Sequence, residues 1–112
     1  MEYSIRGNVL IIQINGDLDH YNAAKIKETS ERYIMENRIK HIVFDFKNTD
    51  FMDSSGIGTI MGRYRLVKAI NGTVSVVNVN EIVGRIFEMS GLYKIVRKCS
   101  NLEDAIAADW RE

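Results

Sequence analysis

Two adjacent serines that could carry a chemical modification lie near the middle of the chain, in the stretch Phe51-Met52-Asp53-Ser54-Ser55-Gly56-Ile57-Gly58. A strand-like run, residues 40–46, precedes this stretch, and an amphipathic run, residues 57–70, follows from its end. Asp and Ser side chains accept hydrogen bonds from the free N–H groups of a first helical turn, so a helix is expected to start here. The two glycines leave that turn without bulky side chains.

The start of a helix carries a partial positive charge of about half an elementary charge, which attracts anions. A phosphate attached to a serine hydroxyl would be stabilised there. If Asp53 or Ser54 is the capping residue, Ser55 lies one step into the first turn with a freer hydroxyl. Local chemistry alone favours the simpler interpretation, in which Asp-Ser-Ser-Gly only caps a helix.

The motif Asp53-Ser54-Ser55-Gly56-Ile57-Gly58, with the upstream turn Gly16-Asp17-Leu18-Asp19, resembles the anti-sigma factor antagonists. These are bacterial members of the STAS domain family. The run that starts at Phe51 and continues into Gly62-Arg63-Tyr64 is most similar to the sporulation-type anti-sigma-F factor antagonists. The resemblance extends over essentially the whole chain and implies a single STAS domain, residues 1–112.

The resemblance also implies a function and its partners. In this family the second serine of the pair, here Ser55, is phosphorylated by an anti-sigma factor that is also a serine kinase. The unphosphorylated protein binds the anti-sigma factor and releases the sigma factor, and a serine phosphatase resets the switch. Such a protein is not an enzyme and needs no cofactor. The expected partner-binding surface comprises Asp19, Met52, Asp53, Ser54, Ser55, Gly56, Ile57 and Gly58.

Within that surface, Met52 and Ile57 are expected to supply exposed apolar contact, and Gly56 and Gly58 to allow close approach. Two other functions remain as alternatives. A nucleotide or small-ligand sensor, as some STAS-like domains are, would bind its ligand without any kinase. A stressosome-type scaffold would form large assemblies, and the sequence shows no added N-terminal domain of that kind.

Other chemistry has weaker support. The hydrolase motif Gly-x-Ser-x-Gly is not present around Ser55, because Asp53 occupies the position of its first glycine. No His/Cys cluster has metal-ligand spacing, and Asp17, Asp19 and Asp53 are read as turn and cap residues rather than as a metal site. The glycines from Gly56 to Gly62 miss the dinucleotide-binding fingerprint by one position.

The composition of the chain gives no support to nucleic-acid or membrane partners. Fifteen basic and fifteen acidic residues cancel, so no electrostatic argument for nucleic-acid binding exists. The longest apolar run is far shorter than the ~20 residues of a membrane span. The single Cys99 cannot form an internal disulfide, which agrees with a reducing cytoplasm.

The elements that must position the serines alternate along the chain. Strands are expected over residues 3–6, 9–14, 41–46, 73–79 and 95–98. Helices are expected over residues 21–37, from the serine motif to residue 70, from the cap Asn80 to residue 90, and over residues 102–110. Gly7-Asn8 predicts a hairpin between the first two strands, and Asn71-Gly72 ends a helix. The pattern predicts an α/β fold with a single mixed, mostly parallel sheet of four to five strands and an antiparallel first strand. About four helices should pack mainly on one face, as in the STAS fold.

The helices also carry predicted buried faces at three- and four-residue spacing. They are Ala23, Ile26, Ser30, Tyr33 and Ile34; Ile57, Ile60, Met61, Tyr64 and Val67; Ile82, Val83, Ile86 and Phe87; and Leu102, Ala105, Ile106 and Trp110. Arg63 is expected to join a basic group that complements the end of its helix. Ser100 to Glu103 has the spacing of a capping box, with Ser100 as the cap.

Overall fold

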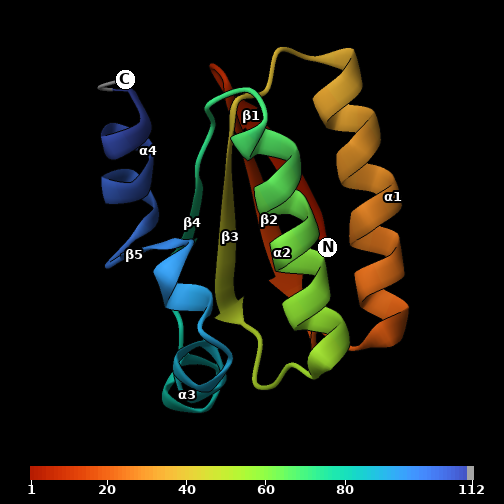
Figure 1. Ribbon diagram of the computed structural model, residues 1–112, viewed down its shortest axis with the longest axis vertical. Helices are drawn as coiled ribbons and strands as arrows, with labels where there is room; N and C mark the ends of the chain where they lie inside the picture. The colour runs from red at the N-terminus through yellow and green to blue at the C-terminus, as the bar shows by residue number, and fades with distance from the viewer. Residues whose placement is uncertain (111–112) are drawn as a thin grey trace.

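The computed structural model describes residues 1–110, with the side chains of residues 108–110 outside the description. Five strands form one sheet in the order β1-β2-β3-β4-β5: β1 (Glu2–Arg6), β2 (Val9–Asn15), β3 (His41–Asn48), β4 (Val74–Val77) and β5 (Arg97–Cys99). The helices are α1 (His20–Glu36), α2 (Ser54–Lys68), α3 (Glu81–Ser90) and α4 (Leu102–Trp110), with a 3-10 helix η1 (Leu92–Lys94) after α3. Helices α1 and α2 lie side by side in front of the sheet (Figure 1).

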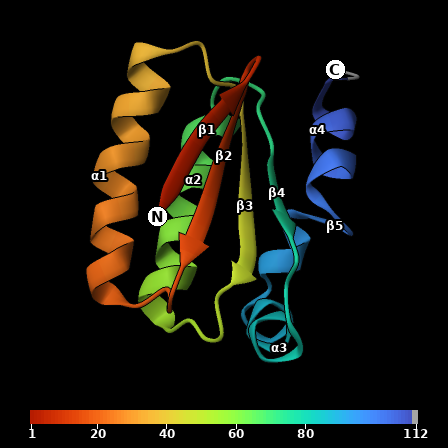
Figure 2. The ribbon, with the colours of Figure 1, turned by 180° about the vertical axis from the view of Figure 1, so that it is seen from behind.

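The sheet has the predicted mixed character. Strand β1 pairs antiparallel with β2 through a hairpin whose Gly7 has a φ of +62°, a backbone conformation that glycine adopts without strain. The three other strand pairs are parallel. Parallel neighbours place their carboxyl ends at the same edge of the sheet, so the loops after β2, β3 and β4 gather there (Figure 2).

Two hydrophobic cores explain why β2 is apolar at nearly every position. Leu10, Ile12 and Ile14 point into the larger core, which α1, α2 and α3 cover. Val9 and Ile11 point to the opposite face and pack with the smaller core below α4. A strand buried on both faces loses the alternation of polar and apolar residues that a half-exposed strand shows.

The helices lie mainly on one face, as predicted, and α4 is the exception. The expected buried face of α1 is confirmed, with Ala23, Ile26 and Ser30 buried and Tyr33 and Ile34 half-buried against the larger core. Helix α2 buries Ile60 and Val67, and its other expected core residues pack against them while half-buried. Ala105 and Ile106 of α4 instead cover the back of the sheet, and the prediction for Trp110 lies outside the described side chains.

The ends of three elements differ from prediction for local reasons. Strand β4 ends at Val77 because Asn78 adopts a φ of +57°, which a strand cannot continue through. Strand β5 begins only at Arg97, since η1 and the turn after it occupy the preceding residues. Asn101, and not Ser100, caps α4, because its Oδ1 accepts the Asp104 N–H at 2.9 Å.

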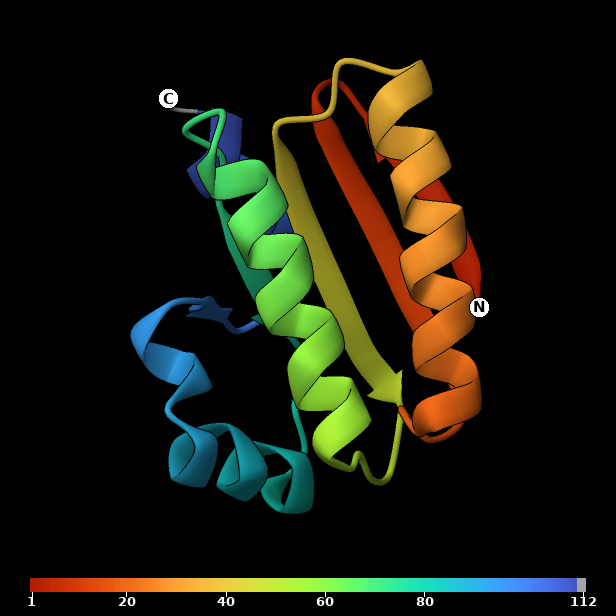
Figure 3. The same cartoon turned by 45° about the vertical axis from the view of Figure 1, so that its right-hand side comes forward.

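Helix α3 buries less of its apolar face than predicted. Val83 and Phe87 are fully buried, and Ile86 is half-buried against the larger core. Ile82 was expected to be buried and is instead 59% exposed, so this prediction is wrong. Helix α3 lies at the carboxyl edge of the sheet and not over its face (Figure 3), so the sheet covers only a narrow stripe of it.

No helix within residues 1–110 is long and apolar enough to cross a membrane.

Candidate functional site

The two motifs singled out in the sequence meet at the carboxyl edge of the sheet. Leu18, in the loop after β2, and Met52, in the loop after β3, form an isolated parallel bridge. The Leu18 N–H donates to the Phe51 carbonyl at 3.0 Å, and the Asp53 N–H donates to the Leu18 carbonyl at 3.3 Å. The acidic turn 16–19 and the serine motif 53–58 are therefore joined through their backbones.

Asp53 is the capping residue of α2. Its backbone is extended, and its Oδ1 accepts the Ser55 N–H at 2.8 Å. Ser54 and Ser55 are consequently the first and second residues of the helix. Their backbone lies in the turn where the positive end of the helix dipole is concentrated.

Replacing Asp53 by alanine is expected to lower the free energy of unfolding by about 1 kcal/mol, because the Ser55 N–H loses its side-chain acceptor. Asp53→Asn retains an acceptor oxygen and should lie within a few tenths of a kcal/mol of the wild type. Urea denaturation followed by circular dichroism measures both. Equal losses in the two variants would show that charge, and not the cap, is what Asp53 contributes.

The two serines differ in their surroundings. Ser54 is exposed, whereas Ser55 is half-buried and lines a groove of about 420 Å³ between α1 and α2. The groove walls are His20, Ala23, Ala24, Lys27, Gly58, Thr59, Gly62 and Arg63. Exposure alone therefore does not select Ser55 over Ser54. Ser55 is not fully outward as the sequence suggested, because it is half-buried and lines this groove together with Lys27 and Arg63.

The predicted exposure of Met52 is wrong. Its side chain is 1% exposed and belongs to the larger core, while the preceding Phe51 is 48% exposed. Successive side chains of an extended segment point to opposite sides, so the bridge between Met52 and Leu18 directs Met52 inward and Phe51 outward. Ile57 is half-buried and packs against the core, so it offers only part of its surface to a partner.

The two glycines of the motif serve different purposes. Gly56 is buried, and a Cβ added to it would lie 2.9 Å from both the Cγ and the carbonyl oxygen of Leu18. Its missing side chain therefore permits packing inside this molecule, and the prediction that it admits a partner is wrong. Gly58 is exposed, and no atom lies within 4 Å of where its Cβ would be. Of these two glycines, Gly58 is the one that leaves the helix surface bare for another molecule.

The acidic turn is held in place by capping. Asp19 caps α1, with its Oδ1 accepting the Asn22 N–H at 2.9 Å, and the Asn22 side chain donates to the Asp17 carbonyl at 2.7 Å. The Asp19 side chain remains exposed beside the serine motif. Within residues 1–110, Asp17, Asp19 and Asp53 do not form a group that could hold a metal ion.

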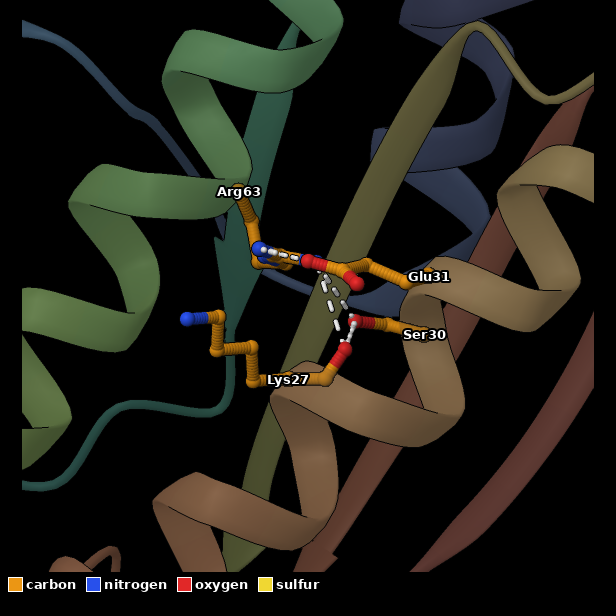
Figure 4. A network of polar contacts seen from close by, with 4 residues as sticks. All are labelled: Lys27, Ser30, Glu31 and Arg63. Carbon is orange, nitrogen blue, oxygen red and sulfur yellow. Dashed lines mark hydrogen bonds and ion pairs between the residues drawn. The ribbon is translucent and has the colours of Figure 1, made fainter.

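Arg63 was expected from the sequence to join a basic group that complements the end of α2, and this interpretation is wrong. It is 5% exposed and reaches from α2 across to α1 (Figure 4). Its Nη1 donates to the Ser30 hydroxyl at 3.1 Å and to the Lys27 carbonyl at 3.4 Å, and its Nη2 lies 3.3 Å from the Glu31 carboxylate. The one sequence signal for this contact is Ser30, a polar residue in an otherwise apolar helix face.

Replacing Arg63 by alanine is expected to lower the free energy of unfolding by about 2–3 kcal/mol, because hydrogen bonds from a buried charged group are lost and the Ser30 hydroxyl is left with its bond to the Lys27 carbonyl. Arg65, two residues further along α2, is exposed and serves as the matched control. Arg65→Ala should change stability by less than about 0.5 kcal/mol. Chemical denaturation measures the free energy of unfolding of both variants. Equal losses in Arg63→Ala and Arg65→Ala would exclude Arg63 as a link between α1 and α2.

Comparison with known proteins agrees with this geometry. A family model of the STAS domain matches residues 1–105. The chain is 40% identical over 98 residues to an anti-sigma F factor antagonist of Paenibacillus polymyxa, which covers 88% of this chain and 84% of that protein.

Two solved structures extend the comparison. The fold matches the anti-sigma factor antagonist SpoIIAA in its unphosphorylated form with a TM-score of 0.84 and 28% identity, over 94% of this chain and 91% of that chain. It matches the Bacillus cell fate determinant SpoIIAA in its phosphorylated form with a TM-score of 0.76 and 27% identity, over 96% of each chain. The chain belongs to the anti-sigma factor antagonists of the STAS domain family.

Proposed function

We propose that this chain is an anti-sigma factor antagonist that phosphorylation of Ser55 inactivates. In its unphosphorylated state it binds an anti-sigma factor with serine kinase activity and so releases the sigma factor that the kinase held. A serine phosphatase restores the active state. The observation that carries the proposal is the Asp53-Ser54-Ser55-Gly56 sequence at the start of α2, in a chain 40% identical to an anti-sigma F factor antagonist. The proposed setting is transcription control during sporulation, in the cytoplasm.

The position of Ser55 suits a switch that needs no refolding. As the second residue of α2, Ser55 lies in the turn that favours a negative charge. The adjoining groove adds the side chains of His20 and Lys27. A phosphate on Ser55 is therefore tolerated by the chain itself. The choice of Ser55 over Ser54 rests on the family pattern, since Ser54 is the more exposed of the two.

The proposed contact surface follows from which motif residues are accessible. Ser54, Gly58 and Asp19 are exposed, and Asp53, Ser55 and Ile57 are half-exposed. The role of the chain in this mechanism is to bind and to accept a phosphoryl group. The base for phosphoryl transfer belongs to the kinase, so Asp53 acts only as a cap.

The test begins with a preformed complex of a cognate anti-sigma factor and its sigma factor. Unphosphorylated chain is added, and free sigma factor is followed by size-exclusion chromatography. Release by the wild type, and equally by Ser55→Ala, is the expected result, because neither chain then carries a phosphate. Failure of both chains to bind the anti-sigma factor would overturn the proposal.

A ligand sensor is the second candidate, and the groove between α1 and α2 favours it. Its walls include the cationic side chain of Lys27, which would suit an anionic ligand such as a nucleotide. This function predicts that a nucleotide raises the melting temperature of the isolated chain, and that Lys27→Ala reduces the shift. No shift at millimolar nucleotide would exclude it.

A further inference from the structure

An apolar surface that the fold leaves largely uncovered lies beside the serine motif. It consists of Phe51, Ile82, Ile86 and Met89 and is called here the α3 surface. Phe51 is 48% exposed, Ile82 59% and Met89 83%, and the side chains surround a groove of about 490 Å³. Contiguous exposed apolar groups of this kind are uncommon on monomeric proteins and mark sites of interaction.

Two residues of the α3 surface, Ile82 and Phe51, have an exposure that the sequence did not predict. Helix α3 needs only Val83, Ile86 and Phe87 to pack on the larger core, yet Ile82 and Met89 extend its apolar character to the solvent side. In the loop before α2, the inward turn of Met52 places Phe51 outside. The chain itself buries neither Ile82 nor Phe51. Contact with another molecule would remove these apolar side chains from water, which is favourable.

The α3 surface is held next to the serine motif. The Asn80 side chain caps α3 through the Val83 N–H at 2.8 Å and donates to the Thr49 carbonyl in the loop after β3 at 2.9 Å. Phe51 belongs to that same loop, two residues before the α2 cap Asp53. The starts of α2 and α3 consequently lie at the same edge of the sheet (Figure 3).

We infer that the α3 surface is the apolar part of the docking site for the anti-sigma factor, and this rests on the function proposed above. A stable interface buries about 800 Å² on each partner, around an apolar centre with a polar rim. The serine motif alone fully exposes only Ser54 and Gly58, because Met52 and Gly56 are buried. The neighbouring α3 surface supplies the missing apolar area.

The same geometry describes what the partner must present. One or two apolar side chains would fill the groove between Phe51, Ile82 and Met89. Glu81 and Arg85 line its margin and lie 3.7 Å apart as an exposed ion pair, so polar groups of both signs would suit the partner there. With this arrangement Ser55 and the α3 surface belong to one contact, so a phosphate on Ser55 opposes docking of the whole surface.

The test measures binding of the unphosphorylated chain to its anti-sigma factor by isothermal titration calorimetry. Ile82→Ser and Met89→Ser are each expected to weaken binding about tenfold or more, since apolar groups at the centre of an interface contribute most of its affinity. Met35→Ser is the matched control, because Met35 is 85% exposed near the end of α1, at the opposite edge of the sheet. It should bind like the wild type. All three replaced side chains are exposed, so unchanged melting temperatures are expected.

The outcomes separate the inference from the proposed function. If wild type, Ile82→Ser and Met89→Ser all bind with equal affinity, the α3 surface is not part of the docking site, while the antagonist function stands. If the wild type does not bind the anti-sigma factor at all, the docking inference and the proposed antagonist function are both wrong. Sedimentation velocity adds a further check: a dimer of this chain that Met89→Ser dissociates would assign the α3 surface to self-association and overturn the inference.

Discussion

Phosphorylation of Ser55 is expected to weaken binding of the anti-sigma factor a few hundredfold. The modification adds roughly −1.5 to −2 elementary charges and a strongly hydrated group at the second residue of α2. In the free chain, solvent and the helix start stabilise that charge. In the complex the phosphate would lose water, and its repulsion by Asp53, the cap of the same helix, would be less screened. A cost of about 3–4 kcal/mol corresponds to the stated loss, because each 1.4 kcal/mol is tenfold.

Ser55→Asp offers a simpler version of this experiment. One added negative charge should weaken binding in the same direction, by at least about tenfold. Ser55→Ala should bind like the unphosphorylated wild type and remain insensitive to ATP. Because the effect is electrostatic, higher salt should reduce the difference between Ser55→Asp and the wild type. Titration calorimetry that finds equal affinities for Ser55→Asp and Ser55→Ala would contradict a charge-based switch.

Gly72→Ala is expected to destabilise the fold by about 3 kcal/mol or more, because overpacking against backbone is costly. Gly72 follows α2, and a Cβ placed on it would lie 1.7 Å from the Lys40 carbonyl oxygen and 2.9 Å from the Val67 Cβ. The Gly72 N–H also donates to the Val67 carbonyl at 2.7 Å. The Lys40 backbone and the Val67 side chain therefore confine this residue, and the end of α2 would have to move away from β3.

Gly62→Ala is the matched control for this prediction. Gly62 lies within α2, and no atom is found within 4 Å of its Cβ position. Alanine there should raise the free energy of unfolding by up to about 1 kcal/mol, through the better helix propensity of alanine. Urea denaturation of both variants gives the comparison. A Gly72→Ala chain as stable as the wild type would show that the α2–β4 connection shifts easily.

The fold was predictable because its signals are local and repeated. Alternating strand and helix patterns predicted the mostly parallel sheet, and Gly7-Asn8 predicted the hairpin that makes β1 antiparallel. The buried faces of α1 and α2 followed from helical spacing. The start of α2 was also predictable, because an Asp-Ser-Ser sequence satisfies free N–H groups.

Several features of the site depend on tertiary contacts that a sequence pattern does not contain. The segment before α2 is irregular, so periodicity could not decide between Phe51 and Met52, and the bridge to Leu18 decides it. Ile82 is exposed because α3 lies at an edge of the sheet. Arg63 is buried because Ser30 and Glu31 of another helix receive it.

The end of α2 gives a further example. Asn71-Gly72 correctly marked the end of the helix, and glycine is the residue expected to adopt a positive φ there. In the structure Asn71 adopts the positive φ, with a value of +62°. Gly72 is needed for a different reason, because its surroundings leave no room for a Cβ. The dipeptide was informative about where the helix ends, and the separate roles of its two residues became visible only from the packing.

The most direct measurement is mass spectrometry of the chain after incubation with a cognate anti-sigma kinase and ATP, in parallel with Ser55→Ala and Ser54→Ala. The account predicts one added phosphate on the wild type and on Ser54→Ala, and none on Ser55→Ala. Phosphate that persists in Ser55→Ala and is lost in Ser54→Ala would make Ser54, the more exposed residue, the acceptor. No phosphate on any of the three chains, together with no binding of the kinase, would contradict the antagonist function.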